Sequence, residues 1–184
     1  MGRMRAGPLA PTDTGEALEA ARACPDAWYR VQALASVAEH ARLALPILEE
    51  AAREARSCHD AYGMVAVMAW PLGVAFKQGR LGFAERELKN CLALASRIEP
   101  RASQAYALEI LWSACFAVDP SHAEPVWSRI LELCRPDHSW RAARLYLHIA
   151  EVEDSRNPGA AAAVIRAMAP GKTRAWLERR FGLA

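Results

Sequence analysis

Apolar residues recur along most of the chain at spacings of three and four, the period of one face of an α-helix. Ala, Leu, Arg and Glu are frequent, and no stretch alternates apolar and polar residues with the β-branched enrichment of a strand. The pattern therefore predicts an all-α protein. Ten helices are expected, over residues 13–24, 26–42, 45–57, 60–78, 82–97, 101–117, 121–134, 137–153, 158–168 and 173–181. Residues 1–12 are expected to form a flexible tail, and residues 13–184 a single domain.

Several polar residues stand where a helix is expected to begin, because a short side chain there accepts a free backbone N–H of the first turn. The expected N-cap residues are Asp13, Asp26, Asp60, Ser121, Asp137 and Thr173. Gly79 suits the end of a helix. Pro71 lies inside the predicted helix 60–78, where it removes one backbone hydrogen bond and is expected to cause a kink.

The longer helices share one apolar stripe. They start near residues 26, 60, 101 and 137, with a shorter fifth near 173, and the stripe repeats at the same offsets within the first four. Its sixteen positions are Val31, Leu34, Ala38, Ala41, Val65, Met68, Leu72, Ala75, Ala105, Leu108, Trp112, Cys115, Ala142, Leu145, Ile149 and Val152. A helical hairpin of about 35 residues cannot bury such a stripe alone, so hairpins of this kind stack on one another. The sequence predicts a right-handed α-solenoid of about five antiparallel hairpins.

One segment resembles a tetratricopeptide repeat. Seven residues occupy positions of that motif: Leu72, Gly73, Phe76, Gly79, Ala84, Leu88 and Cys91. The stretch between the two glycines is one residue short, and Leu88 and Cys91 replace an aromatic residue and an alanine of the family pattern. The resemblance covers about thirty residues closely and the other hairpins only by pattern. It implies a concave groove, lined by the first helix of each pair, that binds peptide segments of partner proteins.

The polar lining of such a groove is expected one residue before the apolar stripe. That column holds Arg30, Met64, Gln104 and Arg141, and Arg144 and His148 lie a turn or two further along the same predicted helix as Arg141. Arginine binds carboxylates through two parallel hydrogen bonds, which suits acidic side chains or a peptide C-terminus. The candidate peptide-binding residues are therefore Arg30, Gln104, Arg141, Arg144 and His148.

The cysteines favour structural positions in a reducing compartment. They are five, an odd number, and none forms a CxxC motif. Cys58-His59 and Cys134 with His138 offer soft metal ligands, but Cys24 and Cys58 share a repeat column with Ile98 at the turn between helices, which favours a small apolar group. Neither a metal nor another cofactor is therefore expected.

Residues 170–173 imitate the end of a phosphate-binding loop. Arg166 stands where that loop needs its first glycine, and a helix rather than a strand is expected before it. A simple turn is the better interpretation.

Aromatic residues and charge leave more than one function open. Trp28, Tyr62, Trp140 and Trp176 fall in the first turn of successive long helices and are expected to pack across repeats, although such rings also stack on nucleobases. Residues 1–156 have a net charge of −2 and residues 157–184 a net charge of +4. The basic end suits either a solvated terminal helix or an acidic partner.

Three functions follow from these patterns. The first is a non-enzymatic, cytoplasmic scaffold, monomeric or homodimeric and without a membrane segment, that binds a protein or peptide in its groove. The second is a nucleic-acid-binding repeat module, whose affinity would fall steeply with salt. The third is an all-helical enzyme, for which His148 and Glu151 are spaced to share one helix face.

Overall fold

The structure, a computed structural model, describes residues 2–134 and 140–184. Within these ranges the chain consists of helices joined by short connections, without a strand. The helices are α1 (Gly2–Leu9), α2 (Thr14–Arg22), α3 (Ala27–His40), α4 (Ala44–Ala55), α5 (Ala61–Val67), α6 (Ala69–Lys77), α7 (Leu81–Ala95), α8 (Arg101–Val118), α9 (Pro120–Cys134), α10 (Trp140–Arg156), α11 (Ala161–Ala167) and α12 (Lys172–Arg180). The expected all-α class is confirmed, with the predicted helices 13–24 to 173–181 corresponding in order to α2–α12.

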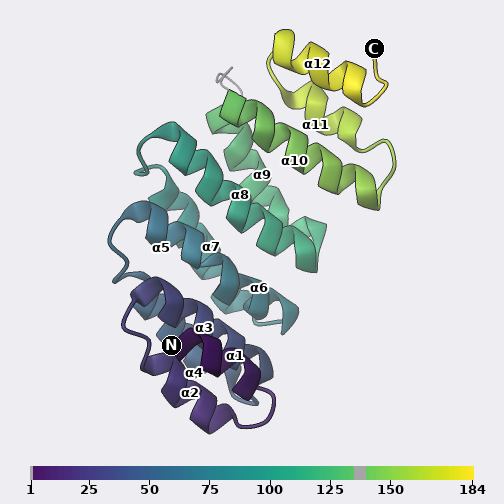
Figure 1. The fold of residues 1–184 in the computed structure, drawn as a ribbon. Coiled ribbons are helices and arrows are strands. Elements are labelled where there is room, and N and C mark those ends of the chain that lie inside the picture. Colours follow the sequence, from purple (N-terminus) through teal and green to yellow (C-terminus); the bar gives the residue numbers. More distant parts are fainter. Residues whose placement is uncertain (1, 135–139) are drawn as a thin grey trace.

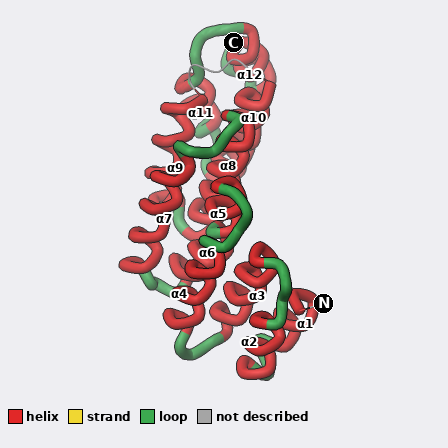
Figure 2. The backbone as a smooth tube through the Cα atoms, turned by 90° about the vertical axis from the view of Figure 1, so that its left-hand side faces the viewer, coloured by secondary structure: helices red, strands yellow, loops and turns green. Residues whose placement is uncertain are grey.

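The helices lie in two layers along an elongated molecule whose ends are near the two termini (Figure 1). Layer A contains α1, α3, α5, α6, α8, α10 and α12, and layer B contains α2, α4, α7, α9 and α11. Within layer A, contacts run from α1 to α3, then to α6, α8, α10 and α12. Each of the pairs α1–α2, α3–α4, α8–α9 and α10–α11 is in contact, as neighbours joined by a short loop should be. Figure 2 shows α4, α7 and α9 along one side and α3, α5 and α10 along the other.

The apolar stripe is the core between the layers. Fourteen of its sixteen positions are buried, and Ala41 and Val152 are half-buried and pack against the same core. On layer B several facing positions are small, and Ala17, Ala21 and Ala84 are fully buried. Small side chains let two helices approach closely, so the larger residues of layer A fill the space between them.

The expected tail over residues 1–12 is corrected by the structure. Residues 2–9 form α1, which packs on α2 and α3. Ala6 and Ala10, one helical turn apart, are buried. This helix covers α2 on the layer A side, so the first hairpin is complete and the helical domain begins before residue 13. Gly7 and Pro8, both poor helix formers, hid it in the sequence.

The predicted N-caps are partly confirmed. Carboxylates accept a backbone N–H of the first turn, at 2.7–3.2 Å, at Asp13, Asp26 and Asp60. Ser121 is wrong as an N-cap, because α9 already begins at Pro120 and the Asp119 carboxylate accepts the Ser121 N–H at 2.8 Å. Thr173 is also wrong, since α12 begins one residue earlier. Asp137 lies outside the described residues.

Pro71 divides the predicted helix 60–78 into α5 and α6, which meet at Met68. Pro71 has no N–H to offer the carbonyl of Val67, and its ring crowds that carbonyl, so the hydrogen-bond ladder breaks there. The expected kink is confirmed. After α6 the chain turns at Gly79, whose φ of +67° favours glycine and whose N–H donates to the Phe76 carbonyl at 3.0 Å.

Candidate binding surface

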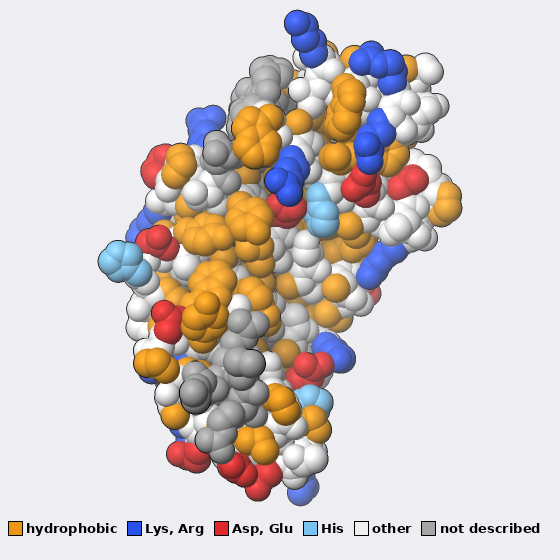
Figure 3. Space-filling model, in the orientation of Figure 1, with side chains coloured by type: hydrophobic (Ala, Val, Ile, Leu, Met, Phe, Trp, Pro, Cys, Tyr) orange, Lys and Arg blue, Asp and Glu red, His pale blue; other side chains and the backbone are white. Residues whose placement is uncertain are grey.

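Four aromatic side chains form a continuous row on layer A, here called the aromatic strip: Trp28, Tyr62, Trp70 and Tyr106, from α3, α5, α6 and α8. Trp28 and Tyr62 are stacked with ring centroids 6.4 Å apart, and Tyr62 and Tyr106 are stacked at 6.3 Å. Trp70 meets the edge of Trp28 at 5.9 Å. Tyr106 is 55% exposed and Trp70 37%. Hydrophobic side chains form a band over α5 and α8 on this face (Figure 3).

The repeat geometry aligns the first part of this row. Trp28 and Tyr62 are each the second residue of their helix, two residues after the N-caps Asp26 and Asp60. Equivalent positions of neighbouring hairpins lie side by side, so the two rings meet, which confirms the expected packing of this pair across repeats.

Two further tryptophans of layer A are exposed. Trp140, the first residue of α10, is 63% exposed, and Trp176 on α12 is 43% exposed. The packing of these two rings across repeats therefore stays a prediction. The Arg180 guanidinium lies 5.7 Å from the ring centre of Trp176.

Three titratable residues, here called the polar cluster, lie between α8 and α10: Glu109, Arg144 and His148. Glu109 is one turn after Tyr106, and its Oε1 lies 4.0 Å from Nε2 of His148. The His148 ring approaches Trp112 edge-on at 6.4 Å. Burial raises the pKa of Glu109, and the nearby His148 and Arg144 lower it only in part. The cluster thus holds a half-buried carboxylate beside two basic groups.

The structure places the predicted groove residues on different sides. Arg30 forms an ion pair with Glu54 of α4 at 3.2 Å, so it faces layer B. Gln104 is buried, and its Nε2 donates to the Ala95 carbonyl at the end of α7 at 2.7 Å. Both were predicted to line the groove, and both instead connect the layers. The side chain of Arg141 lies outside the described residues.

Arg144 and His148 do lie on the outer surface of layer A, beside Glu109. The sequence analysis missed Tyr106, Glu109 and Trp70. Tyr106 and Glu109 each follow a residue of the apolar stripe directly, whereas the chosen column preceded it. The signal was an aromatic residue and a carboxylate at that spacing on the other flank of the stripe.

The cysteines with described side chains are buried and free: Cys24, Cys58, Cys91 and Cys115. Cys24, Cys58 and Ile98 are all buried, as the repeat column predicts. Burial raises the pKa of the Cys91 and Cys115 thiols to about 12, so both are protonated at neutral pH. Cys134 and His138 lie outside the residues whose side chains are described.

Other candidate chemistry is not assembled by the fold. Among the described residues, no group of three or more His, Cys, Asp or Glu is placed to hold a metal ion. Glu151 pairs with Arg180 at 2.8 Å rather than with His148. Lys172 starts α12 directly after α11 and a turn, so no strand precedes residues 170–173 as a phosphate loop requires.

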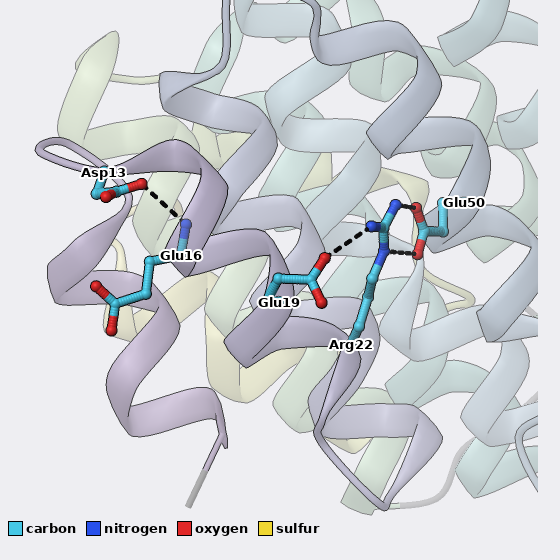
Figure 4. A network of polar contacts seen from close by, with 5 residues as sticks. All are labelled: Asp13, Glu16, Glu19, Arg22 and Glu50. Carbon is cyan, nitrogen blue, oxygen red and sulfur yellow. Dashed lines mark hydrogen bonds and ion pairs between the residues drawn. The ribbon is translucent and has the colours of Figure 1, made fainter.

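Several exposed charges of layer B are paired between helices. Arg22 of α2 donates two hydrogen bonds of 2.8 Å to the two carboxylate oxygens of Glu50 on α4 and one of 3.2 Å to Glu19 (Figure 4). The Arg22 guanidinium lowers the pKa of Glu50. Arg56 of α4 reaches Glu87 of α7 at 3.4 Å in the same manner.

Comparison of the chain with protein-family models, with curated proteins and with solved structures finds no match. Within the described residues, no helix has both the length and the apolar character needed to cross a membrane. The surface of layer A is therefore interpreted from its own geometry.

Proposed function

We propose that this chain is a non-enzymatic scaffold, a right-handed α-solenoid similar to tetratricopeptide repeats, that binds a peptide segment of a partner protein across layer A. The observation that supports the proposal is the aromatic strip, in which rings from four helices contact one another and remain partly open to solvent. Stacked hairpins of this kind create an extended surface rather than an enclosed pocket, which suits an elongated ligand.

The strip has the properties of a binding surface because its rings are large, apolar and already fixed. Aromatic residues are enriched where proteins meet, since each ring covers a large area and keeps a polar tip for hydrogen bonds. Tyr62 is held between Trp28 and Tyr106 by stacking, so little side-chain entropy remains to be lost when a partner covers it. Isolated exposed hydrophobic residues are common on proteins, but a contiguous row indicates an interaction site.

Nucleic acid is the second candidate, since exposed rings near Arg144 suit base stacking beside phosphate contacts. The charge around the strip opposes this function. The carboxylates of Asp26 and Asp60 cap α3 and α5, whose second residues are Trp28 and Tyr62, and Glu109 follows Tyr106 by one turn. A phosphate backbone along the strip would be repelled by these acids at close range, whereas uncharged apolar residues of a peptide would not.

The test is a screen of an immobilised peptide library with the full chain and with the variant Tyr106→Glu. The variant places a charge at the α8 end of the strip at an exposed position, so we expect it to fold and to lose most of the peptide signals. The control is Leu81→Glu, since Leu81 is also exposed but lies at the start of α7 in layer B. Equal loss with both variants, or unchanged binding by Tyr106→Glu, would contradict the proposal.

A further inference from the structure

Some cations of the layer A helices are paired with acids of a neighbouring helix, and others, near the C-terminus, are not. Near the N-terminus, Arg30 pairs with Glu54 and Lys77 with Glu39. Near the C-terminus, Arg144, Lys172 and Arg179 are exposed and form no hydrogen bond or ion pair with any described residue. The acids that could neutralise the last helix are already used, since Glu178 binds Arg174 and Glu151 binds Arg180, each at 2.8 Å.

Helical spacing places these free cations beside the exposed rings. Arg144 follows Trp140 by four residues on α10, and Trp176 on α12 stands four residues after Lys172 and three before Arg179. Residues three or four apart share one face of a helix. Lysine and arginine side chains gather over α10 and α12 on the same face that shows the hydrophobic band over α5 and α8 (Figure 3).

The surface of layer A therefore changes in character along its length. The part formed by α3, α5, α6 and α8 offers rings bordered by carboxylates, and the part formed by α10 and α12 offers rings bordered by cations. A ligand that covers both parts needs apolar groups at the first and negative charge at the second. Unpaired cations on a binding surface attract an acidic partner and raise its association rate, and they repel a basic partner.

We infer, on the basis of the proposed function, that the partner segment of layer A is an amphipathic acidic peptide. Its apolar residues cover the aromatic strip, and its Asp or Glu side chains bind Arg144, Lys172 and Arg179. Packed helices lie about 8–10 Å apart, so the path from α6 across α8 and α10 to α12 spans roughly 24–30 Å. An extended chain rises about 3.3 Å per residue, so about nine residues are enough.

The experiment measures fluorescence anisotropy of labelled synthetic peptides of about nine residues with the full chain. One peptide has leucine, proline and phenylalanine in one half and glutamate in the other, a second has the halves exchanged, and a third has lysine in place of glutamate. We expect a glutamate peptide in one of the two orders to bind at least about tenfold more tightly than the lysine peptide at low salt, with the difference shrinking as salt is added.

The double variant Arg144→Glu/Arg179→Glu is expected to lower the affinity for the glutamate peptide by about tenfold and to raise the affinity for the lysine peptide. The control is Lys89→Glu, which reverses a single exposed cation on α7 in layer B and should leave both affinities unchanged. Circular dichroism of each variant checks that the helices are intact. Because all these positions are on the surface, the variants are expected to fold.

Three results would overturn the inference, and they are distinguishable. Equal binding of the glutamate and lysine peptides, with Tyr106→Glu still abolishing both, would leave the proposed function standing and remove the acidic class. Failure of every peptide here and in the library screen would remove the proposed function as well. Tighter binding of a single-stranded uridine oligonucleotide, lost in the double variant, would replace a protein partner by nucleic acid.

Discussion

Arg22 in layer B and Arg144 in layer A are both exposed cations, yet only Arg22 forms ion pairs with acidic side chains. Arg22 ties α2 to α4 through Glu50, whereas Arg144 reaches solvent beside a half-buried carboxylate. The same contrast holds for apolar groups. Layer B helices face the core with alanines that are fully covered, and layer A helices additionally present rings on their outer side.

This contrast between the layers distinguishes side chains that stabilise the fold from side chains that are free to bind another molecule. Ion pairs between neighbouring helices satisfy part of the outer surface of layer B within the molecule itself. The exposed rings and unpaired cations of layer A add little to the stability of the fold. They remain available to bind another molecule. A surface left unsatisfied over several helices is the physical mark of a site.

The largest expected effect compares two aromatic residues of α8. Trp112 is 1% exposed and stacks on Phe116 with ring centroids 4.6 Å apart, whereas Tyr106 lies on the aromatic strip. Trp112→Ala should lower the free energy of unfolding by about 3–5 kcal/mol because it leaves a large cavity in the core. Tyr106→Ala should cost less than about 1 kcal/mol, mainly the lost stacking on Tyr62. Urea unfolding monitored by circular dichroism measures both values. Equal costs would show that Tyr106 belongs to the core and would remove it from the binding surface.

A smaller effect compares the two arginines. Arg22→Ala should destabilise the protein by about 0.5–1 kcal/mol, because a bidentate pair between two helices is lost but remains partly solvated. Arg144→Ala should change stability by less than about 0.3 kcal/mol, since Arg144 has no such pair. Thermal unfolding at low salt and at 1 M salt checks that the effect is electrostatic, because screening by salt should reduce the destabilisation caused by Arg22→Ala. A cost for Arg144→Ala as large as that for Arg22→Ala would remove the contrast between the layers.

The pH dependence of the Arg22 pair has a definite sign. Because Arg22 lowers the pKa of Glu50 in the folded state, the stabilisation is fully present above the ordinary carboxyl pKa. It is lost as the pH falls through the lowered value. The difference between the parent chain and Arg22→Ala should therefore shrink in acid, and a difference that stays constant would argue against the ion pair as its cause.

The sequence was sufficient for the helices and for the core because burial imposes a periodic pattern. The stripe through Leu34, Leu72 and Leu108 predicted which side of each helix faces inward, and all three are fully buried. Helix α1 was not predicted because Gly7 and Pro8 weaken the helical pattern there, and its formation depends on packing against α2 and α3.

The candidate site was only partly predictable, since a stripe has two flanks that the period alone cannot distinguish. The column of Arg30 and Gln104 precedes the stripe and faces layer B, while Tyr106 and Glu109 follow it and face outward. Which flank is open depends on the direction in which successive hairpins pack, and that is a property of the assembled layers. Arg144 and His148 also directly precede stripe residues, Leu145 and Ile149, yet they lie on the outer surface of α10, so the flank alone does not decide which side chains face outward.

The smallest expected effect concerns Glu109, the carboxylate of the polar cluster. Burial raises its pKa in the folded state, so the ionised form is tolerated less well in the protein than in the unfolded chain. The sign follows directly: the destabilisation is present at neutral pH and disappears as the pH falls through the raised pKa to the ordinary value. Glu109→Gln should therefore be slightly more stable than the parent chain at pH 7, by less than about 1 kcal/mol, and the advantage should vanish near pH 4.

Melting temperatures measured at both pH values test this, with Glu132→Gln on α9 as the matched control, since Glu132 is exposed and pairs with Arg129 within its own helix. If Glu109→Gln were instead less stable at pH 7, the attraction of His148 and Arg144 would exceed the cost of burial. Glu109 would then be satisfied within the molecule as Glu50 is in layer B, and the polar cluster would lose its difference from the paired surface.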